Sequence, residues 1–92
     1  MAGNARAEAL YSGYVQGVGF RYTARQTASR FEVTGFVQNL ANGQVRLVAE
    51  GSQEELQEFL KAVQEEMGEY IEKADVAWGP AAGEFRNFTV RF

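Results

Sequence analysis

Residues 33–50 read VTGFVQNLANGQVRLVAE, and they carry the strongest local signal of the fold. Two segments, 33–39 and 44–50, flank the dipeptide Asn42-Gly43, which favours a type I′ hairpin turn because both central residues of that turn need positive φ. In the second segment apolar residues alternate, which predicts a strand with one buried face: Val45, Leu47 and Ala49. The stretch therefore predicts an antiparallel hairpin.

The residues before this hairpin predict a strand followed by a helix. Residues 7–15 are short, rich in aromatic side chains and bounded by glycine, as strands often are. After Gly17 and Gly19, apolar and small side chains recur at spacings of four, four and three residues, which corresponds to one helix face: Phe20, Ala24, Ala28 and Phe31. Three arginines fall outside that face: Arg21, Arg25 and Arg30.

The residues after the hairpin predict a second helix and two more strands. Ser52, followed three residues later by Glu55, is a capping-box pattern at a helix start, and Gly68 suits the residue just past the helix end. The apolar positions between them have core-facing helical spacing: Leu56, Phe59, Leu60, Val63 and Met67. Residues 70–78 and 84–92 are predicted to be strands, with Phe88, Val90 and Phe92 on one face of the last.

This order of elements predicts an α+β fold. It is a ferredoxin-like βαββαβ sandwich, in which a mostly antiparallel sheet carries both helices on one face and a short fifth strand follows at the C-terminal end. A length of 92 residues corresponds to one domain. We expect that domain to cover residues 7–92, with residues 1–6 as a flexible N-terminal stub.

The composition excludes several kinds of catalytic and metal site. The chain has no cysteine and no histidine, so it forms no disulfide or thiolate metal site and has no thiol nucleophile or imidazole base. No apolar segment approaches the roughly 20 residues of a membrane-spanning helix, and residues 1–6 lack the apolar core of a signal peptide. We therefore expect a cytoplasmic protein that binds no membrane.

Charge is distributed unevenly along the chain. The net charge is −3, but residues 1–49 carry +3 through five arginines, and residues 50–75 carry −7. We interpret the acidic excess as the solvated surface of the second helix and not as a metal site, because an oxygen-ligand loop has a different spacing. The first half suits an anion, although its helical arginines could also be only a solvated face.

A loop that could bind phosphate lies between the first strand and the first helix. If Phe20 and Arg21 begin the helix, the amides before them include donors without intrahelical partners, and Gly17 and Gly19 allow the loop to curl around an anion. Such a loop at the positive end of a helix binds phosphate, and an arginine at its rim can bond two phosphoryl oxygens. The same pattern is also common in simple tight turns.

Two sequence motifs resemble those of the acylphosphatase family. Residues 13–21 read GYVQGVGFR, which is similar to the first family signature, G-x-V-Q-G-V-x-F-R. Residues 35–39 read GFVQN and precede Asn42-Gly43, which is similar to the second, an aromatic residue after glycine and an asparagine before a hairpin turn. The resemblance extends from Ala7 to Phe92 and so covers nearly the whole chain.

The resemblance implies an activity and a set of site residues. The implied enzyme is an acylphosphatase, a hydrolase that cleaves acyl phosphates into a carboxylate and inorganic phosphate without a metal or cofactor. Arg21 corresponds to the catalytic arginine that holds the phosphoryl group, and Asn39 to the residue that orients the attacking water. The phosphate-binding residues would be Gln16, Gly17, Val18, Gly19, Phe20 and Arg21. The implied partners are a small acyl phosphate and inorganic phosphate as a competitive inhibitor, and we expect a monomer.

Some residues depart from this pattern or have simpler explanations. Glu32 stands where the family commonly has glycine at the end of the first helix, so either the helix ends differently or the chain accepts a left-handed residue at about 1 kcal/mol. We expect the aromatic rings of Tyr14, Tyr22 and Phe36 to serve in packing, and Trp78 to be a residue of the sheet.

Two other functions remain open at this stage. An RNA recognition module shares the topology, but it needs stacking aromatics within a basic patch, whereas this chain is acidic and its glycines precede a helix. We therefore expect no nucleic-acid partner. A phosphate-binding regulatory domain without turnover is the other alternative.

Overall fold

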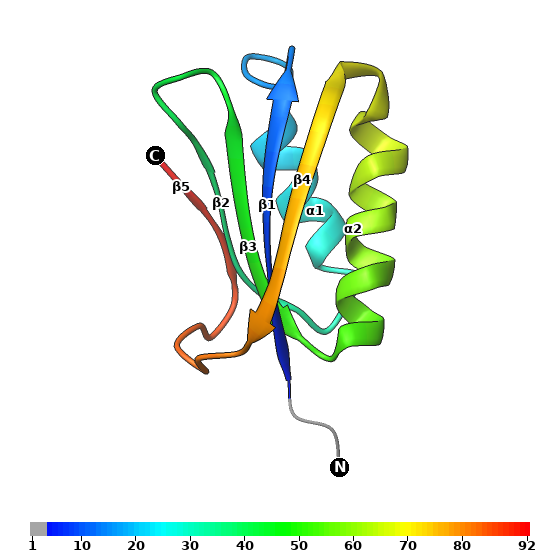
Figure 1. Cartoon of the computed structure of the whole chain (residues 1–92), viewed down its shortest axis with the longest axis vertical. Coiled ribbons are helices and arrows are strands. Elements are labelled where there is room, and N and C mark those ends of the chain that lie inside the picture. Colours follow the sequence, from blue (N-terminus) through cyan, green and yellow to red (C-terminus); the bar gives the residue numbers. More distant parts are fainter. Residues whose placement is uncertain (1–3) are drawn as a thin grey trace.

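The computed structural model describes residues 4–92 (Figure 1). The elements follow one another as β1 (Ala5–Gly13), α1 (Phe20–Ala28), β2 (Thr34–Asn39), β3 (Val45–Gly51), α2 (Gln53–Met67), the 3₁₀ turn η1 (Gly68–Tyr70), β4 (Ile71–Pro80) and β5 (Phe88–Arg91). This is the predicted order. Residues 1–3 of the predicted stub lie outside the described residues, and residues 5 and 6 belong to β1, where they pair with β3 and β4.

The five strands form one mixed sheet in the order β4-β1-β3-β2-β5. β1 is antiparallel to β3 and to β4, and β2 is antiparallel to β3, whereas β5 is parallel to β2. Both helices lie on the same face of the sheet (Figure 1). The structure thus confirms the ferredoxin-like arrangement. The parallel contact brings the C-terminal strand beside β2, which ends at Asn39.

The core fills the space between the sheet and the helices. The predicted helical faces are buried, since α1 contributes Phe20, Ala24 and Ala28, and α2 contributes Leu56, Phe59, Val63 and Met67. The sheet contributes alternate residues of its strands: Ala7, Ala9, Tyr11, Val37, Val45, Leu47 and Ala49. The alternation predicted for β3 is therefore confirmed on this face. None of the helices within residues 4–92 is both long and apolar enough to cross a membrane.

The hairpin forms where predicted, but its turn differs from the predicted type. Gly43 has a φ of 93°, whereas Asn42 does not have positive φ, so the turn is not type I′. Leu40 and Gln44 close a three-residue loop instead: the Gly43 amide donates to the Leu40 carbonyl at 3.2 Å, and the Leu40 amide donates to the Gln44 carbonyl at 2.8 Å. One left-handed glycine after an ordinary turn is sufficient for a loop of this length.

The end of α1 shows that Glu32 does not adopt a left-handed conformation. α1 ends at Ala28 with Ser29 as a right-handed cap, and no residue other than glycine has positive φ among the described residues. The helix thus ends before Glu32, and no strain arises there.

The predicted capping box at the start of α2 forms only in part, because Glu55 makes one of its two bonds elsewhere. Its own amide donates to the Ser52 hydroxyl at 3.1 Å as predicted, but its carboxylate accepts from the Glu32 amide at 2.9 Å, which ties the start of α2 to the segment that follows α1.

The boundaries of the later elements differ from the predicted ones. The predicted C′ residue Gly68 is right-handed, with a φ of −57°, and begins η1, so Tyr70 is not part of a strand. β4 starts at Ile71 and continues to Pro80, and it includes Trp78 as predicted. β5 is shorter than predicted, because only residues 88–91 pair with β2.

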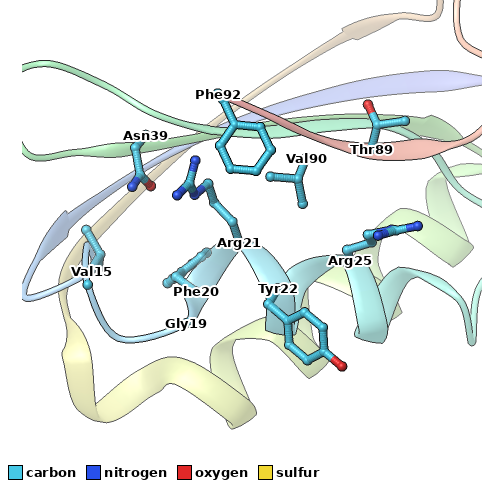
Figure 2. Close-up of a pocket in the computed structure, with 11 residues that line it drawn as sticks. Val15, Gly19, Phe20, Arg21, Tyr22, Arg25, Asn39, Thr89, Val90 and Phe92 are labelled. Atoms are coloured by element: carbon cyan, nitrogen blue, oxygen red, sulfur yellow. The ribbon is translucent and has the colours of Figure 1, made fainter.

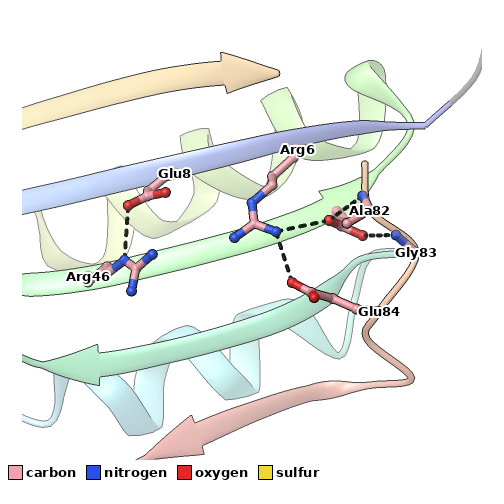
Figure 3. Close-up of polar contacts among 7 residues, drawn as sticks. Arg6, Glu8, Arg46, Ala82, Gly83 and Glu84 are labelled. Atoms are coloured by element: carbon pink, nitrogen blue, oxygen red, sulfur yellow. Dashed lines mark hydrogen bonds and ion pairs between the residues drawn. The ribbon is translucent and has the colours of Figure 1, made fainter. Parts of the chain in front are cut away.

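Residues 81–87 cross the sheet face that the helices leave uncovered. The Glu50 carboxylate, only 4% exposed, accepts hydrogen bonds from the amides of Ala82 and Gly83 at 2.8 and 3.0 Å. Arg6 bridges Glu50 and Glu84, as Figure 3 shows. Phe85 packs edge-on against Phe36, with ring centroids 5.8 Å apart. This segment explains why Phe36 is buried, as expected of a packing residue.

Candidate active site

The loop between β1 and α1 has the conformation expected of an anion cradle. Gly17 and Gly19 have φ values of 77° and 78°, on either side of Val18, and Gly19 is the N-cap residue of α1. The first intrahelical bond joins the Thr23 amide to the Gly19 carbonyl at 2.9 Å. The amides of residues 20–22 therefore have no acceptor inside the helix. Free amides at the positive end of a helix favour an anion.

Gln16 anchors this loop to the hairpin between β2 and β3. Its side-chain amide nitrogen donates to the carbonyls of Leu40 and Gln44, at 2.7 and 2.9 Å. The Gln44 side chain in turn donates to the Ser12 hydroxyl at 2.9 Å. The neighbouring Val15 side chain is fully buried in the core. These contacts fix the loop against the end of β2, which carries Asn39.

The loop borders a cavity of about 530 Å³ (Figure 2). α1 and β5 form its other walls, and β2 contributes one residue. The lining residues are Val15, Gly17, Gly19, Phe20, Arg21, Tyr22, Arg25, Asn39, Thr89, Val90 and Phe92. Beneath it the Phe20 ring packs against Tyr11, with centroids 4.9 Å apart. Burial raises the pKa of the Tyr11 hydroxyl above its ordinary value, so that this group stays neutral.

Arg21 lies in the first turn of α1 and points into the cavity. Its guanidinium carbon lies 4.7 Å from the centre of the Phe92 ring, and Nη1 donates to the Arg91 carbonyl at 3.4 Å. No carboxylate within residues 4–92 forms an ion pair with it. The charge is thus not neutralised within the described chain, and contacts from Arg91 and Phe92 hold the side chain in place.

Asn39 is the last residue of β2 and reaches the same cavity. Its Oδ1 is the one buried side-chain polar atom of the described chain that has no hydrogen-bond partner. Figure 2 shows the side chain of Asn39 and the guanidinium of Arg21 pointing toward one another. A buried acceptor without a partner costs stability, and this one belongs to a residue that lines the same cavity as Arg21.

The structure brings together most, but not all, of the residues singled out in the sequence. Five line the cavity: Gly17, Gly19, Phe20, Arg21 and Asn39. Gln16 and Val18 do not line it, and the Gln16 side chain is engaged with the hairpin instead. The packing roles predicted for Tyr14 and Tyr22 are wrong, since their side chains are 77% and 65% exposed.

Several lining residues were not expected in the site. Thr89, Val90 and Phe92 come from the last part of the chain and reach the cavity through the parallel pairing of β5 with β2. No local pattern signals such a pairing. Arg25 was noted only as one of the arginines off the buried face, although its spacing of four from Arg21 places both on one side of α1. Within residues 4–92, no three His, Cys, Asp or Glu side chains gather as metal ligands would.

Comparisons with known proteins agree on one family. The family model of acylphosphatase matches residues 7–90. An acylphosphatase of Salinibacter ruber is 45% identical over 87 residues, which cover 94% of this chain and 92% of that protein. The crystal structure of an acylphosphatase from Bacillus subtilis superposes with a TM-score of 0.86 at 27% identity, covering 96% of this chain and 99% of the other. An acylphosphatase structure from Coxiella burnetii gives 0.74 at 30% identity, covering 97% and 94%.

Proposed function

Because this chain belongs to the acylphosphatase family, whose enzymes hydrolyse acyl phosphates, we propose that the cavity between α1 and β5 is its active site. In this proposal Arg21 and the amides of the loop at residues 16–20 bind the phosphoryl group, and Asn39 orients the attacking water. The observation that carries the proposal is that one cavity is lined by Arg21, by Asn39 and by the two left-handed glycines.

The phosphoryl group needs positive charge and many donors. Phosphoryl transfer passes through a loose transition state with charge spread over the equatorial oxygens, so a protein catalyses it mainly by positioning and by electrostatic stabilisation. Arg21 supplies a planar charge that can bond two oxygens at once, and the stacking of this group on Phe92 keeps its position. The amides at the start of α1 supply further donors.

The water is assigned to Asn39. An amide oxygen accepts a hydrogen bond from water but cannot take up its proton, and Oδ1 of Asn39 is a buried acceptor with no partner among the described residues. The water oxygen attacks phosphorus while the bond from phosphorus to the acyl oxygen breaks. In our proposal the water proton passes to a phosphate or carboxylate oxygen of the substrate.

The leaving group requires no acid from the protein. It is a carboxylate, and the conjugate acid of a carboxylate has a pKa of about 4, so it departs unprotonated at neutral pH. The absence of histidine and cysteine from the chain is therefore compatible with this reaction. The products are the carboxylate and inorganic phosphate.

Hydrolysis of benzoyl phosphate tests the proposed function. We expect turnover in the presence of EDTA, with inorganic phosphate as a competitive inhibitor and single-stranded RNA without effect. Absence of turnover, together with tight phosphate binding, would favour a regulatory phosphate-binding domain. Loss of turnover in EDTA that returns with added Mg²⁺ would contradict the metal-independent mechanism.

A further inference from the structure

A second arginine, Arg25, lines the cavity that Arg21 enters. It follows Arg21 by four residues on α1, and both border the same space. Figure 2 shows their guanidinium groups pointing in opposite directions, with that of Arg21 toward Asn39. No carboxylate of residues 4–92 forms an ion pair with Arg25. Its charge is therefore available to a ligand.

The cavity is larger than a phosphoryl group needs. Its volume of about 530 Å³ lies in the range of pockets that hold whole organic ligands, about 300–1,000 Å³. Between its two arginines the wall includes apolar groups of Tyr22, Val90 and Phe92. A hydrocarbon segment attached to a bound phosphoryl group can lie against this wall.

The surroundings of Arg25 favour a second anion. Arg25 also borders a neighbouring cavity of about 290 Å³, which is lined by a further arginine, Arg86, and by the polar side chains of Ser29, Thr34 and Asn87. Neither cavity has an aspartate or glutamate in its lining. Beyond Arg25, the neighbouring cavity thus adds a second positive charge and polar side chains next to the active-site cavity.

We propose that Arg25 binds a second negatively charged group, a carboxylate or a phosphate, on the acyl part of the substrate. The preferred substrates are then acyl phosphates whose acyl group carries an anion at its far end. This inference rests on the proposed function, because Arg21 must hold the phosphoryl group for the acyl chain to extend toward Arg25. Arg25 determines specificity here and takes no part in the bond-breaking step.

Rigid aromatic substrates separate the effect of charge from that of size. Benzoyl phosphate carries no second charge, 4-methylbenzoyl phosphate adds bulk alone, and 3- and 4-carboxybenzoyl phosphate add a carboxylate that cannot attack its own acyl phosphate. We expect kcat/KM for the better carboxylated substrate to exceed that for benzoyl phosphate by about fivefold at low salt, as one exposed charge pair can supply. The difference should lie in KM and should shrink as salt is added.

Two arginine variants test whether Arg25 causes this preference. Arg25→Gln should lower kcat/KM for the carboxylated substrate by about fivefold more than for benzoyl phosphate, whereas Arg25→Lys should retain part of the preference. Arg30→Gln is the matched control, because Arg30 lies beyond α1 and outside both cavities. It should leave the ratio between the two substrates at the wild-type value.

The outcomes distinguish this inference from the proposed function. If benzoyl phosphate is hydrolysed but the carboxylated substrates do not have a higher kcat/KM, the role of Arg25 is refuted. The same holds if they have a higher kcat/KM that Arg25→Gln leaves unchanged. In both cases the proposed acylphosphatase activity is unaffected. If no acyl phosphate is hydrolysed, the proposed function itself fails. If Arg25→Gln and Arg30→Gln lower the ratio of kcat/KM for the carboxylated substrate to that for benzoyl phosphate by the same factor, the preference is a general effect of net charge. That result would also refute the inference.

Discussion

The side-chain amide of Gln16 donates a hydrogen bond of 2.7 Å to the backbone carbonyl of Leu40. Through it, the glycine loop that precedes α1 is joined to the residue that follows Asn39. A second bond from the same nitrogen, to the Gln44 carbonyl at 2.9 Å, closes the contact on both sides of the hairpin. One side chain thus holds the proposed phosphate cradle at a fixed distance from the proposed water-binding residue.

Gln16→Ala should impair catalysis through this contact. The variant loses two partly buried hydrogen bonds, so we expect the free energy of unfolding to fall by about 1–2 kcal/mol. A loosened loop also misplaces the phosphoryl group, and we expect kcat/KM for benzoyl phosphate to fall by about tenfold or more. Gln57→Ala, at an exposed glutamine of α2, is the control and should change neither quantity. Wild-type kcat/KM in Gln16→Ala would contradict the assigned positioning role.

Two glycines with similar backbones allow the loop to be tested without a steric clash. Gly19 and Gly43 have φ values of 78° and 93°, and an added Cβ would meet no heavy atom within 4 Å at either. Alanine should therefore destabilise the protein by a similar 1–2 kcal/mol or so at both positions. Only Gly19→Ala should raise KM and the inhibition constant of phosphate, as steady-state kinetics would show. Equal kinetic effects at both glycines would argue against a phosphate cradle in the loop.

Much of the fold could be predicted because its signals are local. The helical face that begins at Phe20, the Ser52 cap and the alternation from Val45 each depend on residues within a few positions of one another. The turn type at Asn42 was wrong because a three-residue and a two-residue loop share the same asparagine and glycine. The two differ in hydrogen bonding across the hairpin, which composition does not reveal.

The less predictable half of the site depends on long-range contacts. Arg21 and Asn39 were predicted as site residues from motifs, but the contacts that hold Arg21 come from Arg91 and Phe92, seventy or more positions away. The fold likewise separates the arginines that give residues 1–49 their charge of +3. Arg6 and Arg46 pair with glutamates, as Figure 3 shows, whereas Arg21 and Arg25 line the cavity. Charge along the sequence therefore indicated an anion site but not which arginines form it.

Glu50→Ala should destabilise the protein. The carboxylate is almost fully buried and accepts from the amides of Ala82 and Gly83 and from Arg6. Hydrogen bonds to a charged group contribute about 1.5–3 kcal/mol, and their loss leaves two amides without their acceptor. We expect the free energy of unfolding in urea to fall by about 2–3 kcal/mol. Glu58→Ala, on the exposed side of α2, should stay within 0.5 kcal/mol or so of the wild type; equal losses would show that residues 81–87 are held by other contacts.

Arg21→Lys separates charge from shape at the proposed phosphoryl site. Lysine keeps the positive charge but loses the planar contact to two oxygens and the stacking on Phe92. Removal of one comparable transition-state donor costs on the order of 2.7–4 kcal/mol. We therefore expect kcat/KM to fall by roughly a hundredfold or more in Arg21→Ala and substantially in Arg21→Lys, with Arg30→Ala near wild type. Full activity in either Arg21 variant would end the assignment.

Asn39→Ala distinguishes positioning of water from binding of phosphate. Because Oδ1 of Asn39 has no hydrogen-bond partner among the described residues, its loss breaks no bond to the rest of the chain, and the free energy of unfolding should change little. The attacking water loses its acceptor, so kcat should fall by about a hundredfold, as for other transition-state contacts of this kind. The inhibition constant of inorganic phosphate should change far less, since Arg21 and the loop amides remain. Parallel losses in kcat and phosphate affinity would instead place Asn39 among the phosphate ligands and leave the water without an assigned residue.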